Sequence, residues 1–412
     1  MAPNTKNYWF VLGREPQIAA AEIDAVLNLK KYDYSPPILK IAAKIEPPKL
    51  IKHLGGTIKI AEELSGSIDE AGLKKIIIDE LKKVKGKINF GLSFYGASEI
   101  NLKQIKILGL EIKKGLKNNG YSVRYVENKE AALSSVTVEK NGLTNRGREF
   151  LISPLFKEGV EGCQHYSLAQ TKAVQPFEEF SARDFGRPGR DNLSGMLPPK
   201  LAMILINLAQ TPLNSTLLDP FCGSGTILSE AVLLGYKNLI GSDLSEKAIS
   251  DSKKNIEWIA QKFKILNDKF QIKYQISNVE NLSRIIAPSS VDAIVTEPYL
   301  GKPLRGQETK QELISQTKEL KNLYLQAFQQ FYQILKPKGK IVFIIPRFKY
   351  IGQWITINCK NEIEKIGFKA LPARIATQSV AGGGPFFENH LPLVYSRPNQ
   401  RVAREIWRFI KR

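Results

Sequence analysis

The chain of 412 residues has little cysteine and little histidine, with three residues of each. Cys163, Cys222 and Cys359 are scattered and odd in number, so they predict neither a disulfide framework nor a metal-binding spacing. The three histidines are equally scattered, and we therefore expect no metal. Cysteines without a framework are typical of the reducing cytoplasm, which is the compartment that the sequence predicts.

Long apolar runs are also missing. No stretch approaches the roughly 18 apolar residues that a membrane-spanning helix needs, and residues 1–6 lack the apolar segment of a cleavable signal. Hydrophobic residues make up 43% of the chain and charged residues 24%, which is typical of a globular protein. The length allows two or three domains, and we expect no membrane partner.

Negative charge is scarce relative to positive charge, and the formal net charge is +20. The excess is +8 in residues 1–160, +4 in residues 161–340 and +8 in residues 341–412. A basic excess at both ends of a chain favours a polyanionic partner, most simply nucleic acid. A generally lysine-rich set of cellular proteins would give the same count, so charge alone leaves both interpretations open.

Residues 219–226 form the most informative motif, Asp-Pro-Phe-Cys-Gly-Ser-Gly-Thr. An apolar run precedes it and an apolar pattern with helical spacing follows it, which predicts a strand, a tight glycine turn and a helix. A phosphate-binding loop would need a Lys-Ser/Thr pair after the second glycine, and a dinucleotide loop would need a third glycine where Leu228 stands. A loop that binds S-adenosylmethionine (SAM) needs neither feature. Two interpretations therefore remain: a SAM-binding loop and a glycine turn without a ligand.

The first 170 residues alternate short apolar segments with amphipathic helical patterns, which predicts an α+β module. Residues 171–197 are interpreted as a linker, because Pro, Gly, Arg and Asp dominate much of that stretch. Residues 198–412 are expected to form a catalytic domain. Expected strands in this part span 216–221, 238–243, 271–277, 291–296 and 340–346, with expected helices at 226–235, 246–263 and 310–335. Such alternation predicts a parallel, doubly wound sheet with ligands at the carboxyl ends of its strands.

Two further strand ends carry polar residues. Asp243 lies 18 residues after Gly225, a spacing at which an acid can reach a ribose diol. The alternative is that Asp243 is a helix N-cap, because a helix begins here; both roles are compatible if Ser245 is the cap. Asn278 and Val279 follow the third strand, where an amide can bond an adenine edge or simply cap a turn.

The fourth strand runs into Glu297, Pro298 and Tyr299. A carboxylate there can accept hydrogen bonds from an exocyclic amine, and an aromatic ring can stack on a base. We expect these three residues to be catalytic, against the alternative of a strand-ending turn. Lys302 and Arg305 follow at once and can grip a phosphate, or belong to a solvated loop.

Together with Arg187-Pro188-Gly189-Arg190-Asp191 and the segment 195–202, the motif at 219–226 resembles class I SAM-dependent methyltransferases with an N-terminal THUMP RNA-binding domain. Within this family the chain resembles in particular the tRNA guanosine N2-methyltransferases that modify position 10, which are sometimes labelled DNA modification methylases. The resemblance implies a Rossmann-like α/β fold with a seven-stranded, mostly parallel sheet, and a ferredoxin-like and THUMP α+β region before it.

The resemblance also implies site residues and a function. We expect cofactor contacts from Asp219, Phe221, Gly223, Gly225, Thr226, Asp243, Leu244, Asn278 and Val279, and substrate contacts from Lys302, Arg305, Arg187 and Arg190. The implied function is SAM-dependent methylation of an exocyclic amine, guanine N2, of tRNA. A DNA or ribosomal RNA amine methyltransferase and a non-catalytic RNA-binding protein are the alternatives.

The chain departs from the family at the amine-methylating motif Asp-Pro-Pro-Tyr. Aligned from Thr296, it has Glu297-Pro298-Tyr299-Leu300, so the acid is one methylene longer and the second proline is absent. Three interpretations follow from the sequence: Tyr299 takes over stacking, the target differs, or activity is lost.

Overall fold

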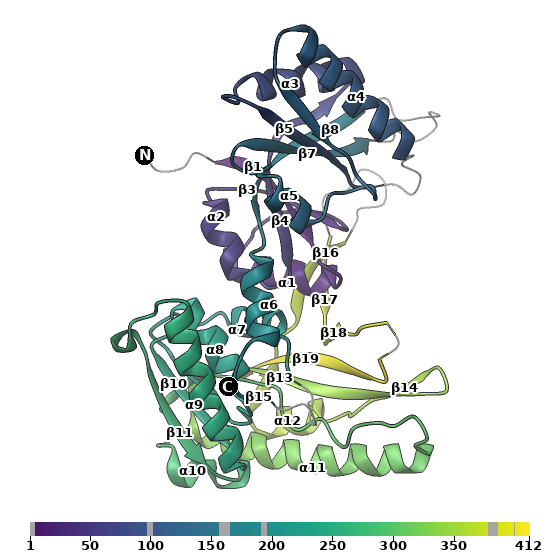
Figure 1. Cartoon of the computed structure of the whole chain (residues 1–412). Coiled ribbons are helices and arrows are strands. Elements are labelled where there is room, and N and C mark those ends of the chain that lie inside the picture. Colours follow the sequence, from purple (N-terminus) through teal and green to yellow (C-terminus); the bar gives the residue numbers. More distant parts are fainter. Residues whose placement is uncertain (1–4, 97–101, 156–164, 191–195, 378–385, 399) are drawn as a thin grey trace. The chain divides into compact units, whose positions relative to one another are not determined.

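The structure is a computed structural model of the chain, and it describes residues 5–96, 102–155, 165–190, 196–377, 386–398 and 400–412 (Figure 1). The chain divides into two compact units. The first comprises Met1–Pro16, Lys30–Phe177 and Ala376–Phe386, and the second comprises Gln17–Leu29, Glu178–Ile375 and Phe387–Arg412. No helix among the described residues is both long enough and apolar enough to cross a membrane.

The first unit is built on a mixed sheet, which in its described part has the strand order β2-β3-β1-β4-β8-β7-β5-β6. The strands are β1 (Lys6–Leu12), β2 (Asp33–Ser35), β3 (Ile38–Ala43), β4 (Thr57–Ile68), β5 (Ile88–Phe94), β6 (Val123–Val126), β7 (Gly147–Leu155) and β8 (His165–Val174). The helices are α2 (Pro47–Leu50), α3 (Glu70–Lys82), α4 (Leu102–Asn118) and α5 (Ser135–Lys140), with a short 3-10 turn at Ile51–His53. Strand β5 runs parallel to β6 and β7, while the other pairings are antiparallel. The predicted α+β character is confirmed, and the THUMP assignment stays a prediction.

Helices α3 and α4 explain why this sheet has a core. Leu73, Ile77 and Leu81 repeat every four residues on α3, so they lie on one face and are buried. Ile112 and Leu116 do the same on α4. All of them pack in one apolar cluster with strand residues of β5, β7 and β8.

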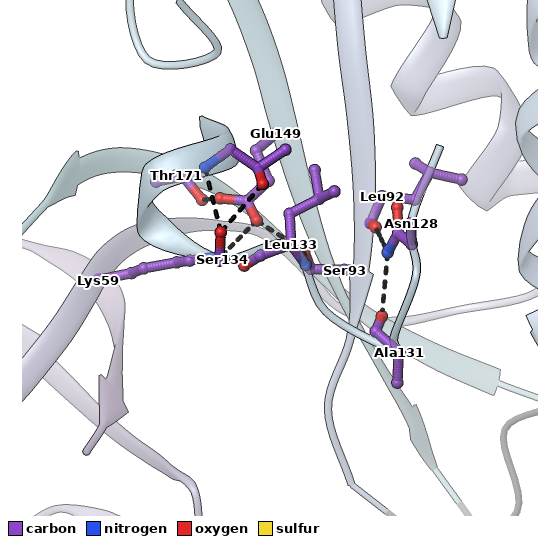
Figure 2. Close-up of polar contacts among 10 residues, drawn as sticks. Lys59, Leu92, Ser93, Asn128, Ala131, Leu133, Ser134, Glu149 and Thr171 are labelled. Carbon is purple, nitrogen blue, oxygen red and sulfur yellow. Dashed lines mark hydrogen bonds and ion pairs between the residues drawn. The ribbon is translucent and has the colours of Figure 1, made fainter. Parts of the chain in front are cut away.

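A buried polar network joins four strands of this unit (Figure 2). Lys59 of β4 is 1% exposed and pairs at 2.5 Å with Glu149 of β7, which is fully buried. Ser93 of β5 and Thr171 of β8 each donate to that carboxylate at 2.6 Å. Lys59 also donates to the carbonyl of Leu133 at 2.7 Å. The network satisfies both charges inside the sheet, which is the condition under which a buried ion pair is tolerated.

The second unit is built on a sheet whose main path in the described part is β11-β10-β9-β12-β13-β19-β15, with β14 on β13 and β18 on β19. Its strands are β9 (Thr216–Asp219), β10 (Asn238–Asp243), β11 (Gln271–Ile276), β12 (Val291–Thr296), β13 (Leu335–Tyr350), β14 (Gln353–Ile355), β15 (Phe368–Ala370), β18 (Leu393–Tyr395) and β19 (Val402–Lys411). Its helices are α1 (Pro16–Leu27), α6 (Phe177–Phe185), α7 (Pro199–Ala209), α8 (Thr226–Leu234), α9 (Glu246–Lys262), α10 (Leu282–Ile285), α11 (Lys310–Ile334) and α12 (Lys360–Ile366). Short 3-10 turns lie at Asn267–Lys269 and Val279–Asn281, and β16 (Ala373–Thr377) pairs with β17 (Phe386–His390).

Strands β9 to β13 pair in parallel, and β19 is antiparallel to β13 and β15. The chain leaves β9 toward β10 on one side, whereas β12 pairs with β9 on the other side. The carboxyl end of β9 is therefore a topological switch point, where ligands bind in open α/β sheets. The predicted Rossmann-like α/β fold is confirmed. The main path of the sheet has the predicted seven strands, of which β9 to β13 are parallel, while β14 and β18 extend the described sheet to nine strands.

Helix α11 covers one face of this sheet. Its N-terminus is held by a capping box between Thr309 and Glu312. Tyr324 and Phe328 are fully buried against Phe343 of β13, with ring centroids 5.1 Å away in each case. Alternate residues of β13 are buried toward the other face, where α7 contacts β12 and β13. Burial on both faces explains the near-continuous apolar sequence of these strands.

The stretch interpreted as a linker contains regular structure. Its first residues continue β8 to Val174, and residues 177–185 form α6. Arg183 of α6 is buried and donates to Glu230 of α8 from Nε at 2.7 Å, which fixes α6 to the second unit. The sequence suggested a linker because Pro, Gly, Arg and Asp dominate much of this stretch, and that composition gives no sign that Arg183 is buried. Residues 191–195 lie outside the described part of the chain.

The buried network predicts a large, local stability effect. Lys59→Met leaves the Glu149 carboxylate buried without its cation, and we expect a loss of about 3–5 kcal/mol in the protection of β5 and β7, measured by hydrogen exchange on the full chain. Lys83→Met removes an equally short but exposed pair with Glu80, where we expect less than about 1 kcal/mol. Equal protection in both variants would contradict a structural role for the network.

Candidate active site

The glycine loop connects β9 to α8 at the switch point. Gly223 and Gly225 have φ values of +49° and +81°, which side chains rarely adopt. A Cβ on Gly225 would come within 2.2 Å of the Ser252 hydroxyl, so this glycine is required for packing. A Cβ on Gly223 would meet nothing within 4 Å, so this glycine leaves the loop backbone open to the space above it.

Asp243 holds this loop from the neighbouring strand β10. Its Oδ2 accepts the N–H of Gly223 at 2.9 Å, and its Oδ1 accepts the N–H of Ser245 at 2.9 Å. A carboxylate oxygen accepts two hydrogen bonds, so each oxygen keeps capacity for a ligand hydroxyl. Helix α9 is capped by Ser245, whose hydroxyl accepts from Ala248 at 3.2 Å. Because Ser245 caps α9, the Asp243 carboxylate is not needed as the helix cap and can bind a ligand at the glycine loop.

Asp219 lies beneath the loop and is 2% exposed. Its Oδ1 accepts from the Thr296 hydroxyl at 2.6 Å and from the N–H of Phe221 at 3.3 Å. Burial raises the pKa of Asp219 to about 7, the two hydrogen bonds oppose that shift, and the nearby Asp243 and Glu297 carboxylates add to it. A bound cation would favour the ionised form of this carboxyl group.

The two arginines expected to contact substrate lie in different surroundings. Arg187 is 5% exposed and donates to the Thr226 hydroxyl at 2.5 Å, so it supports the first turn of α8 and offers no exposed cation. Asn255 of α9 fixes the same segment, because it bonds both the N–H and the carbonyl of Gly189 and also the carbonyl of Ser224. Arg190 is exposed. The sequence gave no sign that Arg187 would be buried.

Apolar and amide residues border the loop at the ends of β10 and β11. Leu244 is 73% exposed and Ile276 is 57% exposed, which is unusual for residues of this kind at two adjacent strand ends. The amide oxygen of Asn278 accepts the N–H of Glu280 at 3.1 Å, so the side chain also caps a turn. The side chains of Val279 and Phe221 pack on the apolar core, which leaves mainly their backbone atoms for a ligand.

The cysteines offer no nucleophile in the described part of the chain. Burial raises the pKa of Cys222 well above its ordinary value and that of Cys359 to about 12, so both remain neutral thiols. Cys163 lies outside the described residues. Those residues also contain no group of three His, Cys, Asp or Glu side chains arranged to hold a metal.

Glu297 follows β12 directly and is held by an arginine from β19. Arg404 donates from Nε to its Oε1 at 2.5 Å, and the two side chains are 15% and 14% exposed. Among the described residues no donor bonds the second oxygen, Oε2. Sequence reasoning missed Arg404, because it lies 107 residues away in a strand with other arginines.

The residues after Glu297 form a loop with an exposed aromatic ring. Pro298 is buried, and Tyr299 is 53% exposed while its carbonyl accepts the hydroxyl of Tyr324 at 2.7 Å. Lys302 and Arg305 are exposed. The backbone of this loop is therefore anchored to α11, and the Tyr299 side chain, two residues after Glu297, is about half exposed.

Two family profiles match the chain. Residues 187–365 match the RMKL-like methyltransferase domain, which includes the glycine loop and Glu297. Residues 110–254 match a DNA methylase family.

Curated relatives share a name. A tRNA (guanine(10)-N2)-dimethyltransferase of Methanocaldococcus jannaschii is 32% identical over 140 residues, which cover 32% of this chain and 38% of that protein. The protein of the same name from Pyrococcus abyssi is 25% identical over 383 residues, covering 88% of this chain and 93% of its own length.

The fold of the whole chain is similar to that of TrmN from Thermus thermophilus, with a TM-score of 0.51 and 15% sequence identity. The match covers 99% of this chain and 100% of TrmN. The likeness to TrmN supports the fold. The family profile and the curated relatives confirm the resemblance predicted from residues 219–226: the chain is related to SAM-dependent methyltransferases.

Proposed function

We propose that this protein is a SAM-dependent methyltransferase that acts on an exocyclic amine of tRNA, most specifically guanine N2. One observation carries the proposal: the Thr296–Asp219 hydrogen bond joins the glycine loop to the segment that bears Glu297. A loop suited to SAM and a carboxylate suited to an amine thus lie on neighbouring strand ends.

The loop residues fit SAM in three ways. Gly223 leaves open space above the backbone, which suits a closely bound amino acid and ribose. Asp243 retains hydrogen-bonding capacity for the two ribose hydroxyls. Leu244 and Ile276 offer exposed apolar surface to the faces of an adenine ring. In this assignment the Asp219 carboxylate attracts the ammonium group of the methionine part.

Bound SAM supplies an electrophilic methyl group, and the chain must then orient the nucleophile. Glu297 Oε2 accepts a hydrogen bond from one amine N–H, which draws the nitrogen lone pair out of conjugation with the base. The same oxygen would take up the proton that the nitrogen loses when it accepts the methyl group, and the thioether of S-adenosylhomocysteine would be the leaving group. Arg404 keeps Oε1 occupied, so that Oε2 is the oxygen presented to the amine. The side chain of Tyr299 is exposed beside this point and can stack on the base.

The substrate class rests on the relatives and on charge. Two relatives, from Methanocaldococcus jannaschii and Pyrococcus abyssi, are named for methylation of guanine 10 of tRNA. The net charge of +20 favours a polyanion over a small uncharged substrate. The match of residues 110–254 to a DNA methylase family favours DNA as the second candidate, with the same amine chemistry.

The direct test is transfer of labelled methyl groups from SAM to unmodified total tRNA, ribosomal RNA and DNA, followed by nucleoside analysis. We expect N2-methylguanosine or its dimethyl form in tRNA. Label in DNA adenine or cytosine would establish the second candidate. No transfer to any of them, despite SAM binding, would contradict an enzymatic role.

The raised pKa of Asp219 predicts a pH dependence of SAM binding. Below pH of about 7 the carboxyl group is protonated and no longer attracts an ammonium group, so affinity measured by calorimetry should fall from pH 8 to pH 6. Asp219→Asn should bind about tenfold more weakly at pH 8 and lose this dependence. Asp243→Asn is the matched control, which weakens binding but retains the slope. A slope that persists in Asp219→Asn would assign it to another group.

The pair of Glu297 and Arg404 predicts a split between binding and turnover. Glu297→Gln keeps the side-chain size but cannot accept the proton, so kcat should fall roughly 10²- to 10⁴-fold while SAM affinity is unchanged. Arg404→Met should lower kcat by less, with partial recovery in Arg404→Lys, because the acid remains but is no longer fixed. Unchanged turnover in Glu297→Gln would show that another group orients the amine.

A further inference from the structure

Strand β13 continues past the sheet and returns as β14, which makes a hairpin from Pro346 to Ile355. Cross-strand partners are Phe348 with Ile355 and Tyr350 with Gln353, so only Ile351 and Gly352 form the turn. Figure 1 shows this hairpin projecting away from the rest of the sheet.

The tip of the hairpin carries a residue that its backbone disfavours. Ile351 has φ of +42° and Gly352 has φ of +76°, the combination of a two-residue hairpin turn that normally contains Asn and Gly. A β-branched side chain is a genuine outlier at positive φ. Ile351 is also 83% exposed, so burial of its side chain does not offset the backbone strain. Residues with strained backbone cluster at active sites, ligand clamps and switch regions.

The hairpin has one face in the core and one basic, aromatic face. Phe348 is fully buried in the core cluster that Tyr350 and Ile355 also contact. On the other face, the Arg347 guanidinium lies 4.5 Å from the centre of the Trp354 ring, and the Lys349 ammonium lies 5.9 Å from it.

The Arg347 guanidinium is not saturated with hydrogen bonds inside the protein. Its Nε is buried without a hydrogen-bond partner among the described residues. The carboxylate that faces Arg347 electrostatically is Glu405 of β19, which is bonded to Trp407. This face therefore holds cations that are not all neutralised by paired acids.

The hairpin rises from the same sheet edge as Glu297. Pro346 is paired with Arg404, the residue that holds Glu297. Five further residues of extended chain put the tip roughly 17 Å beyond that pair. The N–H of Lys349 bonds the carbonyl of Arg401, whose side chain lies over Gly306 in the loop that contains Lys302 and Arg305. Glu308 accepts backbone N–H groups of that loop and is the acid near Arg401.

We propose that the β13–β14 hairpin is a nucleic-acid contact, in which Ile351 packs against a base of the RNA substrate beside the target nucleotide. Arg347 and Lys349 bind phosphates on either side of that base. The roughly 17 Å from the Pro346–Arg404 pair to the tip corresponds to a few nucleotides of one strand. Apolar side chains, isoleucine among them, are used by nucleic-acid-binding proteins as wedges that insert between bases and partly unstack them. The inference rests on the proposed function for the identity of the nucleic acid and for the position of the target nucleotide at Glu297.

The test separates the strain of Ile351 from its contact. Ile351→Asn suits the turn better, so we expect an equal or higher melting temperature. We also expect an affinity for unmodified tRNA, measured by fluorescence anisotropy, that is about five- to tenfold weaker, with SAM affinity unchanged. Leu266→Asn removes a comparably exposed apolar residue before the amino end of β11, and should leave tRNA affinity unchanged.

Lys349→Gln should weaken binding for all RNA sequences alike and reduce the salt dependence of log Kd by about one, whereas Lys338→Gln at the other end of β13 should not. Equal tRNA affinity of wild type and Ile351→Asn would overturn the proposal, as would a weaker affinity accompanied by a lower melting temperature. The anisotropy assay measures binding of tRNA without methyl transfer. A failure of methyl transfer would therefore count against the proposed function, and the test of the hairpin would not depend on it.

Discussion

The hydrogen bond from Thr296 to Asp219 is the interaction on which the candidate site depends. It spans two neighbouring parallel strands, β12 and β9, at the point where the chain reverses its direction across the sheet. Because both residues are buried, this bond fixes the spacing between the glycine loop and Glu297. Methyl transfer between two bound groups requires such fixed spacing, since a small displacement of either group lowers the rate sharply.

The second unit supports this arrangement from both sides. Asp243 ties the loop to β10, Asn255 ties it to α9, and Arg404 ties Glu297 to β19. The site is thus assembled from strand ends that a rigid, doubly covered sheet holds in register. In each of these three contacts a carboxylate, an amide or a guanidinium group bonds to the backbone or to an opposite charge. Hydrogen bonds that involve a charged group are stronger than those between neutral groups.

The sequence predicted the sheet and the loop well, because both depend on local patterns. Alternating apolar strands and helices with capping residues give the order of elements, and Gly223 and Gly225 mark a turn that only glycine makes easily. Arg404, Arg183 and Lys59 could not be predicted, because each acts on an acid far away in the chain and nothing in its neighbours marks it. Arg187 was misjudged for the same reason: whether an arginine is buried depends on distant packing. The acid of this site, Glu297, is one methylene longer than the aspartate of the Asp-Pro-Pro-Tyr motif. Its ion pair with Arg404 can hold the longer side chain in position.

The central claim is that the glycine loop and Glu297 form one methyl-transfer site. An experimental structure of the full chain with S-adenosylhomocysteine tests it most directly. The account predicts the ribose hydroxyls on Asp243, the amino acid part over Gly223, and the thioether sulfur directed toward Glu297. A ligand bound elsewhere, or bound with its sulfur turned away from Glu297, would contradict it.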